Sequence, residues 1–110
     1  RLVREHRDDV SARVALAELL LERKEVSEAA GLAAELEKNG LQTAPRYFLQ
    51  GRVLLAQGRP REAVAAIQQG LTLDPGSADG LYARGIAERM LGLEKQAEAS
   101  FREALEKKDR

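Results

Sequence analysis

The sequence contains no cysteine, and this absence excludes disulfide bonds and thiolate chemistry. Its 18 basic and 18 acidic residues cancel, so it lacks the surplus of Lys and Arg that general binding to nucleic acid or to a membrane surface requires. No apolar run approaches the ~20 residues of a membrane-spanning helix. Proline and β-branched residues are sparse, which disfavours a β-sheet protein.

Residues that carry catalysis or bind metal are also scarce. His6 is the only histidine, so a zinc site has no second imidazole to draw on. Ser27 and Ser100 have no base at motif spacing. Carboxylate pairs such as Glu18 with Glu22 are typical of a solvated helix face. We therefore expect a chain that is not an enzyme and that uses no metal and no cofactor.

The residues that are present predict packed amphipathic helices, with 44% hydrophobic residues, mostly Ala and Leu, and 33% charged residues. The sequence also matches itself at an offset of 34 residues. The matches include Gly51 with Gly85, Gly58 with Gly92, Ala63 with Ala97, Ile67 with Phe101 and Leu71 with Leu105. A weaker copy lies one period earlier. We therefore expect repeats at 10–43, 44–77 and 78–110, after a segment 1–9 that contains the end of a preceding helix and a turn.

Each repeat reads as two helices joined by a short turn. In the second repeat, Tyr47, Gly51 and Leu54 fall on one helical stripe. Gly58 is suited to end that helix and Pro60 to begin the next, and Pro75 disfavours helix at the residue before it. The small residues that recur at the same place in each repeat indicate close helix contacts.

These residues resemble the tetratricopeptide repeat family, whose 34-residue unit is a helix–turn–helix. The second repeat carries the resemblance through Tyr47, Gly51, Leu54, Ala63, Ile67 and Pro75. The third repeat departs at Glu88, where a large apolar residue is usual. The first departs at Arg13, in the aromatic position, and at Lys24, in place of the turn glycine. The resemblance implies an all-α fold, a right-handed α-α superhelix (solenoid) of three helix-turn-helix repeats.

In this family the first helices of successive repeats line a concave face. The resemblance implies that the inward positions are Ser11, Val14, Glu18, Leu21 and Glu22, then Pro45, Phe48, Arg52, Leu55 and Ala56, then Asp79, Tyr82, Ile86, Arg89 and Met90. Of these, we expect the partner to contact Val14, Glu18, Leu21, Phe48, Arg52, Leu55, Tyr82, Ile86, Arg89 and Met90. An apolar groove with a few charges suits an amphipathic helix or an extended peptide. Chaperone-binding members of the family clamp a terminal carboxylate, which Glu18 would repel.

The sequence thus predicts a non-catalytic scaffold that binds another protein or peptide with apolar anchor residues, without nucleic acid and without membrane contact. Three alternatives stay open. In the first, the groove residues pack against the next superhelical turn or a flanking segment instead of a partner. The uncapped C-terminal helix, with Phe101 and Leu105, joins copies into a homo-oligomer. The chain is the docking segment of a larger enzyme; because it begins at Arg1 rather than Met, we expect it to be part of a longer protein.

Overall fold

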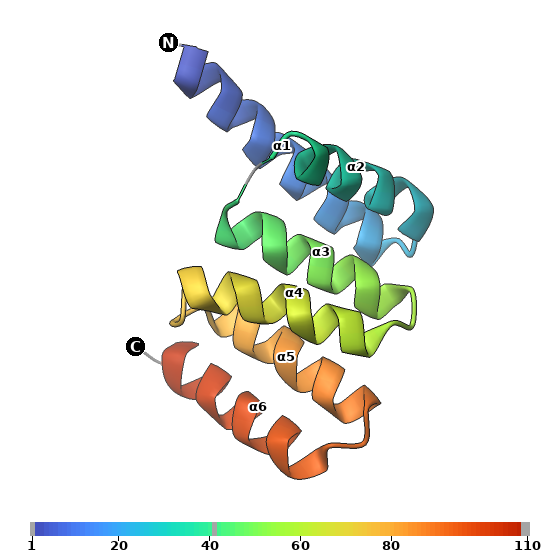
Figure 1. Ribbon diagram of the computed structural model, residues 1–110, viewed down its shortest axis with the longest axis vertical. Helices are drawn as coiled ribbons and strands as arrows, with labels where there is room; N and C mark the ends of the chain where they lie inside the picture. The colour runs from blue at the N-terminus through green and yellow to red at the C-terminus, as the bar shows by residue number, and fades with distance from the viewer. Residues whose placement is uncertain (1, 41, 109–110) are drawn as a thin grey trace.

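The computed structural model describes the backbone of residues 2–40 and 42–108 and the side chains of residues 9–40 and 42–108, so the side chain of His6 lies outside the described residues. Within these ranges it contains six α-helices and no strand. The helices are α1 (Leu2–Glu22), α2 (Val26–Lys38), α3 (Ala44–Ala56), α4 (Pro60–Leu73), α5 (Ala78–Met90) and α6 (Glu94–Lys108). They stack in chain order along the longest dimension of a body that measures 45 × 31 × 23 Å (Figure 1).

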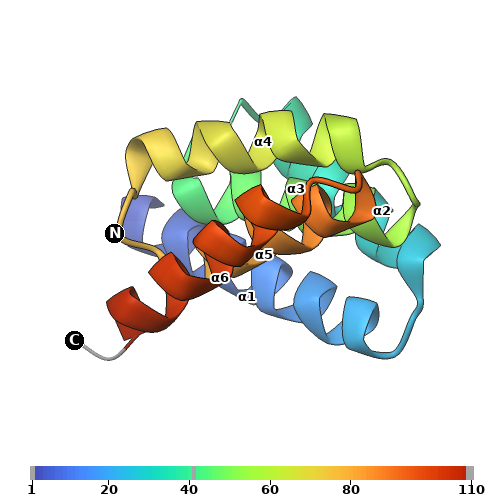
Figure 2. The same cartoon turned by 90° about the horizontal axis from the view of Figure 1, so that it is seen from below.

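The six helices form three hairpins that recur at the predicted spacing. The second helices α2, α4 and α6 begin at Val26, Pro60 and Glu94, each one repeat length after the last. The first helices α3 and α5 begin at Ala44 and Ala78, again one repeat length apart. Viewed along the stack, α2 and α4 lie on one side and α1 on the other (Figure 2). The predicted all-α right-handed superhelix of three helix-turn-helix units is therefore confirmed.

The first helix differs from the prediction at its beginning. The sequence predicts the end of a preceding helix and a turn within residues 1–9, whereas α1 runs without a break from Leu2 to Glu22. It is longer than each of the other five helices, and its first turns extend beyond α2 (Figure 1). The segment before residue 10 contains no glycine or proline that would end a helix.

The turn inside each hairpin contains one residue in the left-handed conformation. These residues are Lys24, Gly58 and Gly92, with φ of 64°, 74° and 79°, and they occupy the same place in the three repeats. In each turn the next backbone N–H donates to a carbonyl five residues earlier, as Glu25 does to Leu20 at 2.8 Å. Lys24 therefore forms the same turn as the two glycines, although an L-residue is strained in this conformation.

Small residues let the two helices of a hairpin approach closely, as the recurrence of glycine and alanine predicts. A Cβ atom added at Gly51 would lie 2.5 Å from Cγ1 of Ile67. One added at Gly85 would lie 2.6 Å from the nearest ring atom of Phe101. Both distances are shorter than any tolerated Cβ contact, so these two glycines set the spacing of α3 from α4 and of α5 from α6.

The core consists of two apolar clusters that meet at α3. The first joins α1, α2 and α3 through Ala17, Leu20, Ala29, Ala33, Leu36, Leu49 and Val53. The second joins α4, α5 and α6 through Ala63, Ile67, Leu71, Leu81, Ala83 and Ala104, with Phe48, Leu54 and Leu55 of α3 packed against it. Each buried Leu or Ile contributes about 1.5–3 kcal/mol. Because α3 belongs to both clusters, its position is fixed relative to α1 and to α5.

Candidate functional site

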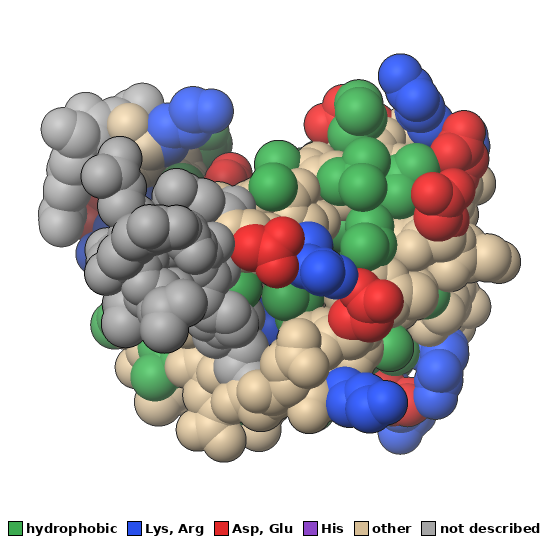
Figure 3. Space-filling model, turned by 90° about the horizontal axis from the view of Figure 1, so that it is seen from above, with side chains coloured by type: hydrophobic (Ala, Val, Ile, Leu, Met, Phe, Trp, Pro, Cys, Tyr) green, Lys and Arg blue, Asp and Glu red, His purple; other side chains and the backbone are tan. Residues whose placement is uncertain are grey.

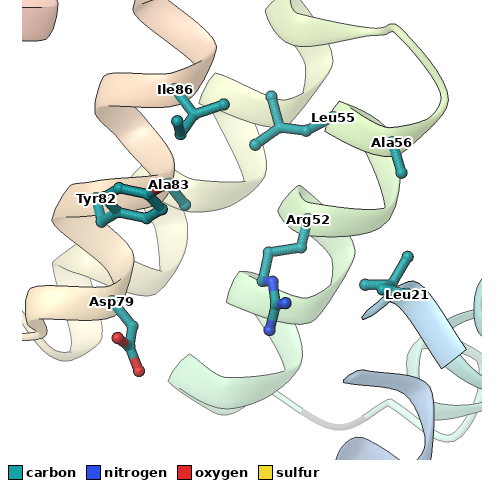
Figure 4. A pocket seen from close by; sticks show the side chains of 8 residues that line it. All are labelled: Leu21, Arg52, Leu55, Ala56, Asp79, Tyr82, Ala83 and Ile86. Carbon is teal, nitrogen blue, oxygen red and sulfur yellow. The ribbon is translucent and has the colours of Figure 1, made fainter. Parts of the chain in front are cut away.

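A pocket of about 480 Å³ opens between the three first helices. The described residues that line it are Leu21 of α1, Arg52, Leu55 and Ala56 of α3, and Asp79, Tyr82, Ala83 and Ile86 of α5. Figure 4 shows Arg52 of α3 lying between Leu21 on one side and Asp79 and Tyr82 on the other. The lining is mostly apolar, with one basic and one acidic side chain, and Tyr82 is 58% exposed.

The pocket exists because equivalent positions of successive repeats fall on one face of the stack. Leu21 and Leu55 are one repeat length apart, and so are Arg52 and Ile86. Seven of the eight lining residues stand at the inward positions that the family resemblance implies. Among the residues expected to contact a partner, the structure brings together Leu21, Arg52, Leu55, Tyr82 and Ile86.

An ion pair at the edge of the pocket joins Arg52 to Glu18, the residue at the equivalent position of the first repeat. Arg52 Nη1 donates to Glu18 Oε2 at 3.1 Å, which links α3 to α1. Both side chains are about two-fifths exposed, so the pair contributes at most about 1 kcal/mol to stability. Asp79 stands in the first turn of α5, where the helix dipole favours a negative charge, and it is exposed. It forms no ion pair with the other side chains that the structure describes.

Two of the residues expected in the groove pack inside the fold instead. Val14 is partly buried against the first apolar cluster. Phe48 lies between α4 and α5, where a Cβ atom added at Gly70 would be 2.5 Å from its ring and one added at Gly80 would be 2.6 Å from it. The two glycines form a slot that holds the Phe48 ring. Neither residue lines the pocket, and the expectation that both contact a partner stays a prediction.

Two more of the expected residues stand apart from the pocket. The guanidinium of Arg89 lies 5.9 Å from the ring centre of Phe101, on the side of α5 that faces α6. The cation is attracted to the face of the ring, and this contact draws the side chain away from the groove. Met90 is the last residue of α5 and is exposed, but it does not line the pocket.

The sequence did not indicate Ala83 as part of the site. Its equivalent in α3 is Leu49, and both side chains are buried. The smaller alanine lines the pocket together with Tyr82 and Ile86. The signal was the change from leucine to alanine at a core position, which becomes informative only when the neighbouring helix is known.

A polar network in the third hairpin explains the departure at Glu88. The hydroxyl of Ser100 donates to Glu88 Oε1 at 2.6 Å and accepts from Arg84 Nε at 2.9 Å. The equivalents of Glu88 and Ser100 in the second hairpin are Leu54 and Ala66, so an apolar contact there is replaced by hydrogen bonds here. Ser100 is 2% exposed, so it is out of reach of a substrate, and the network serves to hold α5 against α6.

A second charged group links α1 to α2. Arg13 bonds Asp9 at 3.2 Å and also pairs with Glu35. The hydrogen bond to Asp9 and the two negative charges raise the pKa of the Arg13 guanidinium above its ordinary value. Arginine is charged at any working pH, so this shift gives the protein no pH dependence.

Within residues 9–40 and 42–108, no three His, Cys, Asp or Glu side chains are grouped so that they would hold a metal ion. None of the described helices is both long enough and apolar enough to cross a bilayer.

The comparisons with known proteins agree with the fold. The family model described as "Tetratricopeptide repeat" matches residues 1–41 and 48–110. The chain therefore belongs to the tetratricopeptide repeat family, whose members bind other proteins and are typically non-catalytic. A solved structure of MamA ("MamA MSR-1 C2") is similar with a TM-score of 0.73 and 19% sequence identity. The match covers 98% of this chain and 62% of that one. No curated protein matches the sequence.

Proposed function

We propose that this chain is a protein-binding module that holds a helix or an extended segment of a partner in the groove between α1, α3 and α5. The observation that carries this proposal is the pocket of about 480 Å³, lined by equivalent positions of three successive repeats. Its volume falls in the range of about 300–1,000 Å³ that is usual for ligand sites. The exposed ring of Tyr82 supports it further, because tyrosine is enriched among the residues that dominate binding energy.

The charges around the pocket favour a partner segment with an apolar anchor next to a basic residue. Two carboxylates, Asp79 and Glu18, face one guanidinium, Arg52, and that guanidinium is already paired with Glu18. The carboxylate of Asp79 is therefore the one that would form an ion pair with a Lys or Arg of the partner. A terminal carboxylate would instead meet a net negative groove, so a carboxylate clamp is disfavoured.

Peptides selected from a displayed library on the immobilised chain provide the test, with affinities measured by fluorescence anisotropy. Tyr82→Ala should weaken binding about tenfold, since truncation of a central interface residue costs more than about 1 kcal/mol. Leu73→Ala is the matched control, because Leu73 is similarly exposed on α4 and does not line this pocket. Affinity that Tyr82→Ala leaves unchanged would place the binding surface outside the groove and contradict the proposal.

The charge of the partner is tested with Asp79→Asn. This variant should weaken peptides that carry a Lys or Arg beside the anchor, and it should not affect versions of the same peptides with glutamine at that place. Asp74→Asn is the control, because Asp74 is exposed in the turn before α5 and does not line the pocket. Equal effects on both peptide series would show that Asp79 does not select a basic residue.

A further inference from the structure

The face of α1 that points away from α3 carries the exposed apolar residues Ala12, Leu16 and Leu19, and the other first helices bury the equivalents of Ala12 and Leu19. Leu19 is 42% exposed, whereas its equivalents Val53 and Ala87 are 5% and 0% exposed. Leu16 is 45% exposed on the same stripe, and Ala12 is exposed one turn earlier. Figure 3 looks onto this end of the stack and shows hydrophobic side chains gathered beside charged ones.

Contacts inside the molecule show what kind of element covers these positions. On α3 the equivalent face meets α2, where Gln50 donates to Glu37 at 3.3 Å. On α5 it meets α4, where a Cβ atom added at Gly80 would lie 3.0 Å from a methyl carbon of Leu71. In both places the covering element is the second helix of the preceding hairpin. The exposed stripe of α1 is therefore shaped for a helix equivalent to α2 or α4.

The chain carries such a helix at its other end. In α6 the residue equivalent to Leu71 is Leu105, and it is 63% exposed where Leu71 is 5% exposed. Among the residues that the structure describes, no first helix covers this face of α6. Two hollows of about 510 and 450 Å³ flank Leu105 and Phe101, and both are open to solvent. Their size suits side chains such as leucine.

The charges at the two ends are complementary. Helices α4 and α5 run antiparallel, so a helix stacked in the same way on α6 would bring its N-terminal end to Lys108 and its C-terminal end to Glu94. The N-terminal part of α1 carries Asp9, and its C-terminal end is followed by Arg23. Asp9 would then face Lys108, and Arg23 would face Glu94. The interior equivalents of Lys108 and Asp9 are Asp74 and Ser77, whose backbones are hydrogen-bonded at 3.3 Å.

We propose that the α6 face of one molecule binds the α1 face of a second copy, so that Leu16 and Leu19 enter the hollows beside Phe101 and Leu105. The contact repeats the packing of α4 on α5 between two molecules. It joins different surfaces on the two copies, so it extends head to tail and does not close into a two-fold dimer. It does not depend on the groove proposed above. Only a few apolar side chains are exposed at each end, which predicts weak and reversible association.

Analytical ultracentrifugation of the chain from about 10 µM to about 1 mM tests this proposal. The average mass should rise with concentration above the 12.1 kDa of one chain. Leu19→Glu and Leu105→Glu should each be monomeric, because each places a buried charge in the contact. An equimolar mixture of the two should form a dimer and nothing larger, since each variant keeps one intact face.

Leu73→Glu is the control for an added charge at an exposed leucine, and it should associate as the parent does, since Leu73 lies on α4 outside both faces. Far-ultraviolet circular dichroism verifies that every variant is folded. A parent chain that is monomeric throughout would overturn the proposal, and neighbouring repeats would then be what covers these faces. Association that survives Leu19→Glu or Leu105→Glu, or a mixture that remains monomeric, would overturn it as well.

Discussion

Replacing Lys24 with glycine should relieve backbone strain, and this gain is about as large as the charge interaction that the substitution removes. Lys24 has a φ of 64°, a conformation that costs an L-residue about 1–2 kcal/mol. Glycine gains more freedom in the unfolded chain, which offsets about 0.4–1 kcal/mol of this relief. The net gain for the backbone is therefore about 0.5–1 kcal/mol. Near the end of α1, the lysine charge also interacts favourably with the helix dipole, by about 0.3–1 kcal/mol.

Lys24→Ala separates these two effects, because it loses the charge and keeps the backbone strain. Urea unfolding followed by circular dichroism should give Lys24→Gly a free energy of unfolding about 0.5–1 kcal/mol above that of Lys24→Ala, with the same slope. Gly58→Ala and Gly92→Ala should lose a similar amount relative to the parent. No atom lies within 4 Å of the Cβ position at either glycine, so the loss would come from the backbone conformation alone.

The reasoning would be refuted if Lys24→Gly were no more stable than Lys24→Ala. A repeat protein can open one hairpin at a time, so a small global change could hide a local one. Amide hydrogen exchange at Lys24 and Glu25, whose N–H groups close the turn, reports the local stability directly. Slower exchange at Glu25 in Lys24→Gly than in Lys24→Ala is the expected result.

Two further predictions concern packing. Phe48→Ala should lower the free energy of unfolding by about 2–4 kcal/mol, because it empties the slot formed by Gly70 and Gly80. Tyr82→Ala should change the free energy of unfolding by less than about 1 kcal/mol, because that ring is exposed. Urea unfolding measures both, and equal losses would contradict the different placement of the two rings. Gly85→Ala should lower the free energy of unfolding by about 1–3 kcal/mol, because the added Cβ would collide with the Phe101 ring. Gly31→Ala should raise it by about 0.5–1 kcal/mol, because the Cβ position in the middle of α2 has open space around it. Thermal melts that show the same sign for both variants would exclude this account.

The repeat architecture could be read from the sequence because its signals are local. The glycines that end the first helices and the small residues at the hairpin contact recur at a fixed period, and helix pairing follows from short turns. The groove positions follow from the same spacing. Leu21 and Leu55 reach the pocket because each stands at the same place on a first helix. The beginning of α1 was predicted wrongly, because a helix that no glycine or proline interrupts has no local sequence signal for where it starts.

The direction of individual side chains depended on residues far away in the sequence. Phe48 and Tyr82 occupy equivalent positions, but Phe48 turns into a slot that requires glycine at two places on two other helices. The equivalent of Gly70 beside Tyr82 is Ala104, and the tyrosine ring is exposed and tilted against Phe101, with 5.6 Å between the ring centres. Repeat spacing assigns the same orientation to both rings, but small differences between the hairpins change the residues that surround them.

Those differences have a consequence for how the chain finds its own fold. A molecule made of similar hairpins can in principle pair a first helix with the wrong second helix, one repeat away, since the apolar faces are alike. If α5 paired with α4 in the way that α3 does, Glu88 would face Ala66 and its carboxylate would lose the hydroxyl of Ser100. A partly buried carboxylate that loses its hydrogen-bond donor destabilises the fold by about 1–3 kcal/mol. The serine and the glutamate thus mark α5 and α6 as belonging together, and they penalise a register error that hydrophobic packing alone would tolerate.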